Sequence, residues 1–200
     1  MNLVLLQHFN AILNTLDDRD YLLAKVAWEI APTFWGIKPG SLMSFSAHTR
    51  NLCYLWEKYR QEVCSFLPLQ YFEMKKTERH TMVLFYHHDM LARILDRRES
   101  RALLKSLGYK NDVTPSQILQ ILQTKLEYLF PHEIGLLLGI PAEDVIGFIN
   151  NKGENCLLCG YWKVYHNPQR AGNIFQIYDM ARNKVMQQIC HWQEMASTPA

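Results

Sequence analysis

Apolar residues recur at helical spacing along much of the chain. In the first segment Leu5, Phe9 and Leu16 fall on one side of a helix, because positions three and four apart share a helical face. This spacing predicts an amphipathic helix over residues 3–16. The same pattern predicts helices over residues 20–29, 51–66, 100–107, 133–138 and 141–150. The letters DMLARIL indicate another helix after residue 88.

Two further helices carry boundary signals. Thr114-Pro115-Ser116-Gln117 combines an N-cap residue, a proline at the first helical position and a glutamine that closes a capping box. Pro131 ends this helix, whose predicted buried stripe is Ile118, Leu122, Leu126 and Leu129. Asn167-Pro168 begins a long last helix. Its predicted buried positions are Phe175, Tyr178, Val185, Ile189 and Trp192.

Strand-like segments are few and lie far apart. They cover residues 42–46, 80–88 and 156–165, and the prolines and glycines of APTFWGIKPGS mark a structured loop before the first. Several helices with about three non-adjacent strands predict an α+β fold. We expect a single, mostly helical domain over residues 1–196 with a small antiparallel sheet, followed by a polar tail at residues 197–200.

Composition disfavours several classes of partner. The 21 basic and 19 acidic side chains leave a net charge of +2, without the clustered basic face that nucleic acid or an anionic membrane requires. No apolar run approaches the roughly 18 residues of a membrane-spanning helix. The first residues lack the cationic start of a signal peptide, and the five cysteines are an odd number. We expect a cytoplasmic protein with reduced thiols, no nucleic-acid partner and no membrane partner.

The segment EIGLLLGIPAEDVIGFI, residues 133–149, has the spacing of a helix-turn-helix. Gly135 takes the small position of the first helix, and Gly139 takes the turn. Base reading favours Arg, Lys, Asn or Gln on the second helix. The residues expected to be exposed there are Pro141, Ala142, Glu143, Asp144 and Ile146. Phosphates would repel the two carboxylates, so DNA binding is disfavoured and a packed helical corner is the alternative.

Cys156 and Cys159 form a C-x-x-C motif. A zinc site would need a second pair of ligands, which the adjacent Cys190 and His191 do not supply in ordinary geometry. We therefore assign no metal ligands. A thioredoxin-like pair would begin a helix, but these thiols precede or lie within a predicted strand, where alternation turns them to opposite faces. Packing is the favoured role, and metal or redox chemistry is the alternative.

Three positions are candidates for polar chemistry. His132-Glu133 is a candidate acid–base pair, although no H-E-x-x-H follows because position 136 is Leu. The alternative role of His132 is to flank the helix that begins there. Lys38 lies in a loop suited to holding an anion, and Lys163 alternates with apolar residues. Both lysines have the alternative of a solvated side chain.

The chain resembles the DUF3793 family over nearly its whole length. Three segments carry the resemblance in the same order: APTFWGIKPGSLMSFS, FPHEIGLLLGIPAEDVIGFI and GYWKVY. The matching positions are Pro32, Thr33, Gly36, Lys38, His132, Glu133, Gly135, Gly139, Asp144, Gly147, Gly160, Tyr161, Trp162, Lys163 and Tyr165. The family has no known function and occurs mainly in anaerobic Firmicutes. Its members often carry a cysteine before Ala-Pro-Thr, where this chain has Ile30, which argues against a mechanism that needs that thiol.

The resemblance also implies a setting of iron, haem or electron transfer, because the family is associated with flavodoxin and ferrous-iron transport genes. Haem, flavin and iron are therefore the cofactor candidates. Neither the resemblance nor the residues name a reaction, so enzyme activity is left undecided.

Residues and resemblance together predict one aromatic, partly cationic pocket for a small anionic or planar ligand. The expected ligand-binding residues are Thr33, Lys38, Tyr161, Trp162, Lys163 and Tyr165, and the expected catalytic residues are His132 and Glu133. Strand alternation would place Trp162 on the face opposite to Tyr161, Lys163 and Tyr165. The competing hypothesis is a non-catalytic interaction module that contacts a redox partner such as a flavodoxin-like protein.

Overall fold

The computed structural model describes residues 2–48 and 50–197. Its helices are α1 (Leu3–Thr15), α2 (Asp18–Glu29), α3 (Ala31–Phe34), α4 (Leu52–Ser65), α5 (His88–Leu95), α6 (Arg98–Ser106), α7 (Pro115–Lys125), α8 (Ile134–Leu137), α9 (Ala142–Asn150) and α10 (Pro168–Ser197). Its strands are β1 (Gly40–Ser46), β2 (Gln70–Lys76), β3 (His80–Tyr86), β4 (Leu158–Cys159) and β5 (Lys163–Val164). The predicted polar tail begins inside α10, and residues 198–200 lie outside the described part of the chain.

The main sheet has three antiparallel strands in the order β1-β3-β2. The central strand β3 pairs Val83 with Met43 of β1 and with Glu73 of β2. The predicted α+β fold with a small antiparallel sheet is confirmed. The sheet's third strand is β2, which sequence analysis missed because its glutamine, glutamate and lysines are poor strand formers. Lysines are nevertheless typical of an edge strand.

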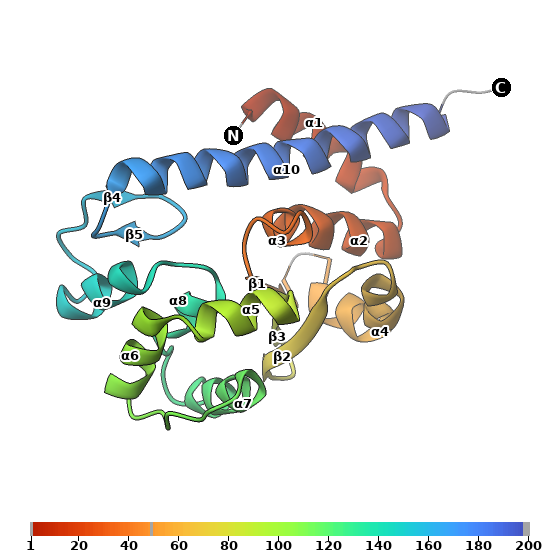
Figure 1. The fold of residues 1–200 in the computed structure, drawn as a ribbon. Helices are drawn as coiled ribbons and strands as arrows, with labels where there is room; N and C mark the ends of the chain where they lie inside the picture. Colours follow the sequence, from red (N-terminus) through yellow and green to blue (C-terminus); the bar gives the residue numbers. More distant parts are fainter. Residues whose placement is uncertain (1, 49, 198–200) are drawn as a thin grey trace.

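Helices cover both faces of this sheet (Figure 1). On one face Phe45 and Phe85 pack against Trp56 of α4, with ring centroids 4.6 and 5.6 Å from the Trp56 ring. Residues of α1, α2 and α10 complete that core. On the other face Leu84 and Tyr86 belong to a core built with α5, α6, α7, α8 and α9. Burial on both sides explains why β3 is an almost continuous apolar run.

Helix α10 connects the two ends of the molecule. It lies along α1, α2 and α3, and its first turns reach the β4–β5 hairpin (Figure 1). There Tyr178 of α10 packs with Trp162 and Val164 of the hairpin. Asn167 caps the helix as predicted, since its side-chain oxygen accepts the backbone N–H of Arg170 at 3.1 Å. Neither α10 nor any other described helix combines the length and apolar content needed to cross a membrane.

Residues 156–165 form a hairpin, so the prediction of one strand is wrong. The two-residue strands β4 and β5 pair antiparallel, and Gly160 donates its N–H to the Trp162 carbonyl at 3.1 Å across the turn. A Cβ at position 160 would collide with the Phe175 ring, so the turn depends on glycine. Because the chain reverses here, side chains do not alternate along one strand. The prediction of which side chains share a face rested on that alternation.

Helices α7 and α10 begin where their capping residues predicted, but some of the residues predicted to be buried in them are exposed. The capping box between Thr114 and Gln117 is formed, which confirms the start of α7. Leu129 was expected to be buried but is 61% exposed, because α7 ends at Lys125. Trp192 is 57% exposed, because Met186 and Cys190 occupy the buried side of α10 instead.

We expect Gly40→Ala to lower the free energy of unfolding by about 1–3 kcal/mol. An added Cβ would lie 2.7 Å from the Leu137 carbonyl oxygen, which is backbone and cannot rotate away. Gly172→Ala in α10 is the matched control, since nothing lies within 4 Å of its Cβ position. It should be neutral or stabilise by up to about 1 kcal/mol through helix propensity. Urea unfolding measures both, and a Gly40→Ala protein as stable as wild type would contradict the contact.

Candidate functional site

Four residues singled out in the sequence line one cavity of about 260 Å³, which we call the aromatic cavity: His132, Tyr161, Trp162 and Lys163. The cavity lies between the segment that leads into α8, helix α9 and the β4–β5 hairpin. The rest of its wall is mostly apolar, and comes from Phe130, Ile134, Gly135, Leu138, Ile140, Asp144, Val145 and Phe148. Two of the three segments expected to converge therefore meet here, and the APTFWGIKPGS loop does not reach this cavity.

The corner between α8 and α9 forms one wall. An added Cβ at Gly135 would lie 3.0 Å from Val145 Cγ2, so the two helices pack closely at this glycine. Gly139 ends α8 with φ +80°, a conformation that favours glycine. Ala142 and Asp144 were expected to be exposed, which is wrong: both are buried. The start of α9 is therefore packed through Ala142 and Asp144, while Glu143 between them stays exposed.

Asp144 holds the hairpin against α9. Its Oδ2 accepts the indole N–H of Trp162 at 2.8 Å. Its Oδ1 accepts the backbone N–H groups of Tyr165 and His166, each at 2.8 Å. The side chain is 1% exposed, so these three donors replace the water that the carboxylate loses on burial.

The rings around the cavity contact one another in a continuous series. The Trp162 and Phe175 rings meet edge to face with centroids 4.5 Å apart, and Tyr161 meets Tyr178 in the same way at 5.1 Å. The His132 ring lies 5.1 Å from the Phe148 ring. Four rings, those of His132, Phe148, Tyr161 and Trp162, therefore line the cavity together with Phe130.

The cation of the aromatic cavity is Lys163. Its Nζ donates to the Gly153 carbonyl at 2.7 Å, and an ammonium has three N–H groups in total. Alternation was expected to separate Trp162 from Tyr161 and Lys163, but all three line the cavity. The reason is that Tyr161 and Trp162 lie in the hairpin turn, where side chains do not alternate between two faces.

His132 and Glu133 point in different directions. His132 lines the aromatic cavity, whereas Glu133 is buried and its Oε1 accepts Lys125 Nζ at 2.6 Å and the Tyr109 hydroxyl at 2.9 Å. Burial acts to raise the pKa of the Glu133 carboxyl, but hydrogen bonds from Lys125, from its own backbone amide and from Tyr109 outweigh it and lower that pKa. Burial and the Glu133 charge together raise the pKa of Tyr109. Glu133 is held as a charged structural partner and does not face the aromatic cavity.

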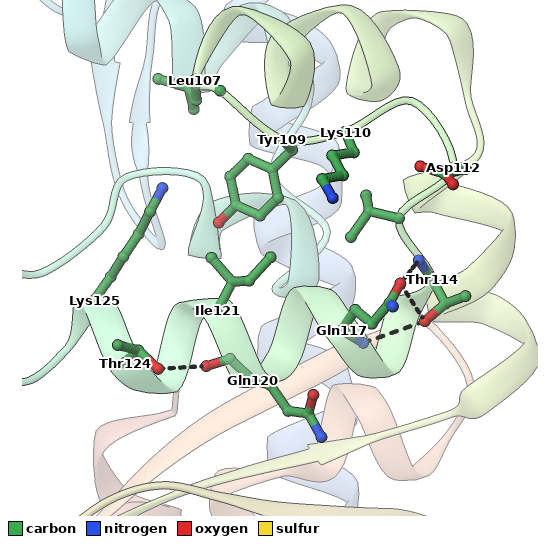
Figure 2. A pocket seen from close by; sticks show the side chains of 12 residues that line it. Leu107, Tyr109, Lys110, Asp112, Thr114, Gln117, Gln120, Ile121, Thr124 and Lys125 are labelled. Carbon is green, nitrogen blue, oxygen red and sulfur yellow. Dashed lines mark hydrogen bonds between the residues drawn. The ribbon is translucent and has the colours of Figure 1, made fainter.

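Figure 2 shows a larger cavity of about 630 Å³ between α7 and the loop that follows α6. Tyr109 and Ile121 face each other across it, and Lys125 stands at one end. Its hydroxyl and amide groups include Thr114 and Gln117, which are already bonded in the capping box of α7. None of the residues expected to bind a ligand lines this cavity.

Three residues of the expected ligand-binding set lie outside the aromatic cavity. Thr33 is fully buried, and its hydroxyl bonds to Ser41 at 2.7 Å. Tyr165 packs against Gly147, and its hydroxyl is buried without a hydrogen-bond partner. Lys38 extends instead toward α10, where its Nζ lies 5.4 Å from the centroid of the Tyr178 ring.

The two thiols of the C-x-x-C motif are free. Cys156 is half-buried and Cys159 is exposed. Within residues 2–48 and 50–197, no group of three or more His, Cys, Asp and Glu side chains is arranged to hold a metal ion.

Sequence analysis missed Phe130, Asp144 and Phe148 as parts of the site. Asp144 was expected to be exposed, because its partners lie 18 to 22 residues further along the chain and local spacing does not indicate them. Phe148 lies within the helix-turn-helix-like segment at residues 133–149, whose spacing does not assign it to a site. The sequence alone does not show that the Asp144 carboxylate contacts the aromatic GYWKVY segment, because the two lie far apart along the chain.

We expect Asp144→Asn to destabilise the hairpin by about 1–3 kcal/mol, because the amide NH₂ would oppose the indole N–H of Trp162 or the two backbone donors. Hydrogen exchange at the amides of Tyr165 and His166 should accelerate, and the fluorescence of Trp162 should shift toward that of a solvated indole. Glu143→Gln on the exposed side of α9 is the matched control and should change neither signal. Unchanged exchange in Asp144→Asn would contradict the role of this carboxylate.

Glu133→Gln should lower the free energy of unfolding by about 1–3 kcal/mol near neutral pH. Because the folded-state pKa of Glu133 lies below its ordinary value of 4.5, the charge stabilises the fold above that value. This contribution is lost as pH falls through the lowered pKa. Wild type and variant should therefore converge in urea unfolding as the solution is acidified. A difference that stays constant down to the acid limit would show that the Glu133 charge is not responsible.

Comparison with known proteins places the chain in a family. No curated protein and no solved structure matches it. The sequence model of one family, described as proteins of unknown function (DUF3793), matches residues 26–198. The match spans the segments that line the aromatic cavity, the α3–β1 loop and all of α10, and it confirms the resemblance seen in the three sequence segments. The chain therefore belongs to the DUF3793 family.

Proposed function

We propose that the protein binds a small planar ligand carrying an anionic group in the aromatic cavity. The observation that carries the proposal is that His132, Phe148, Tyr161 and Trp162 line the same cavity as the ammonium-bearing Lys163. Aromatic walls with one or a few placed polar groups are the usual composition of small-molecule sites. A ring system would contact the flat surfaces, and its anionic group would lie near Lys163.

The volume of the cavity restricts the ligand. At about 260 Å³ it falls just below the roughly 300–1,000 Å³ of typical ligand pockets. A single ring or a fused ring system fits this space with its substituents outside, whereas a haem macrocycle does not. Among haem, flavin and iron, the size and the aromatic lining favour a flavin-like ring.

The side chains that line the aromatic cavity include one group that can bind an anion and one group that can transfer a proton. Lys163 keeps N–H groups beyond the one that it donates to Gly153, so it can add a charge-assisted bond to an anion. His132 is the acid–base group on the wall. Glu133 does not share this task, because Lys125 and Tyr109 hold its carboxylate away from the cavity. We also propose a cytoplasmic location, which the free cysteines support.

A second candidate function is the docking of a protein partner, for which a flavodoxin-like protein is the proposed example. The supporting observation is a run of three exposed apolar residues beside the cavity: Tyr128 is 87% exposed, Leu129 61% and Phe130 51%. Phe130 also lines the aromatic cavity, so a partner bound there would cover its rim. Ligand and partner would then meet at the same edge of the molecule.

Flavin mononucleotide and uncharged riboflavin are the probes for the ligand. We expect both to bind with quenching of tryptophan fluorescence, and Lys163→Met to weaken the mononucleotide about tenfold while leaving riboflavin unchanged, as expected for loss of a charge-assisted bond. Phe148→Ala should weaken both, with the fold checked by circular dichroism. Lys110→Met removes a lysine from the larger cavity and is the charge-matched control.

Two outcomes would count against the small-molecule proposal. One is that neither probe binds at millimolar concentration, which would favour the docking function. The other is that Lys110→Met weakens the mononucleotide as much as Lys163→Met, which would place the ligand outside the aromatic cavity.

A further inference from the structure

Helix α10 holds the Tyr161 ring where it lines the aromatic cavity. Tyr161 lies in the turn of the β4–β5 hairpin and is 37% exposed. Its hydroxyl donates to Oδ1 of the half-buried Asp179 at 2.7 Å. Its ring meets the buried Tyr178 ring edge to face, with centroids 5.1 Å apart, and the guanidinium carbon of Arg182 lies 5.2 Å from its centroid. Residues 178, 179 and 182 of one helix thus contact the same side chain.

The next residue of the turn, Trp162, is held in a similar way by another helix. Its indole N–H donates to Oδ2 of Asp144 in α9 at 2.8 Å. Tyrosine and tryptophan side chains each carry a single polar hydrogen, and in Tyr161 and Trp162 a carboxylate accepts each of these hydrogens. Both residues therefore offer the cavity their rings, while their donors are used elsewhere.

The Tyr161 phenol stays protonated near neutral pH. Burial raises the pKa of Tyr161 to about 12, and the hydrogen bond to Asp179 acts in the same direction, against the opposing charge of Arg182. The O–H is therefore present for donation to Asp179 at neutral pH. A hydrogen bond from a hydroxyl to a carboxylate is stronger than one between two neutral groups, so it can fix the orientation of the ring.

We infer that Asp179 is a positioning residue of the aromatic cavity: it fixes the Tyr161 ring as a contact surface for the planar ligand and keeps the Tyr161 hydroxyl from bonding to that ligand. The inference rests on the proposed function. It assigns the hydrogen bonds that the ligand receives to Lys163 and His132, whose side chains line the same cavity. The ligand class is then a planar ring whose acceptor atoms meet those two groups, and whose apolar surface contacts the rings of Tyr161 and Trp162.

The first test measures the affinity of Asp179 variants for flavin mononucleotide and riboflavin. We expect Asp179→Ala to weaken both about fivefold, because the Tyr161 ring loses the bond that orients it. Asp179→Asn keeps an Oδ1 acceptor and should bind both within about twofold of wild type. Gln176→Ala, at an exposed position of α10, is the control and should bind like wild type. Wild-type affinity in Asp179→Ala, or an Asp179→Asn protein as weak as Asp179→Ala, would overturn the inference.

A double-mutant cycle separates positioning from a general effect on α10. Tyr161→Phe removes the same hydrogen bond from its donor side, so it should weaken both flavins about as much as Asp179→Ala does. The double variant should be no weaker than either single variant, since only one interaction is lost. Losses that multiply in the double variant would show that the two residues act independently, against the inference.

A measurement without ligand follows the Tyr161 ring itself by fluorine NMR of protein labelled with fluorotyrosine. Tyr161→Phe assigns the signal. We expect Asp179→Ala to move this signal toward that of free fluorotyrosine, and Asp179→Asn and Gln176→Ala to leave it in place. An unchanged signal in Asp179→Ala would overturn the role of Asp179, whereas a wild-type protein that binds neither flavin while its Tyr161 signal responds as expected would contradict the proposed function instead.

Discussion

The buried carboxylate of Asp144 is the interaction on which the candidate site depends. It accepts one side-chain and two backbone N–H groups, all at 2.8 Å, and it lies at the start of α9 where the helix dipole also favours a negative charge. The carboxylate fixes Trp162 by its indole and the following chain by its backbone. Besides this anchor, two short strands, ring contacts and the hydrogen bonds of Lys163 to Gly153 and of Tyr161 to Asp179 hold the hairpin. Such a hairpin is marginal by itself.

The rest of the fold places that anchor. The central strand β3 separates two cores, and α8 packs on the start of β1 where Gly40 leaves room for the Leu137 carbonyl. Helix α10 then spans from α1 to the hairpin (Figure 1). Because α10 contacts both ends, its face between Tyr178 and Arg182 meets the α3–β1 turn on one side and the hairpin rings on the other.

The His132-Glu133 pair shows how adjacent residues come to have different roles. Successive side chains along a helical turn point about 100° apart, so one faces the aromatic cavity while the other is buried beside Tyr109 and Lys125. If the two residues acted together as acid and base, both side chains would have to lie within hydrogen-bond distance of the same reacting group. The geometry supports a binding site with a single histidine rather than a proton relay through the glutamate.

The sequence by itself determined the α+β class, most helix positions and the capping box at Thr114, because these depend on local periodicity and capping. It did not determine the hairpin at 156–165 or the polar edge strand β2. The residues of β2 have low strand propensity and form a strand because they pair with β3. Only the tertiary structure decided that Asp144 binds Trp162, that Glu133 turns away from His132 and that Lys38 reaches α10. These pairings join segments far apart in the chain, and their stability comes from burial that exists only once the helices have packed.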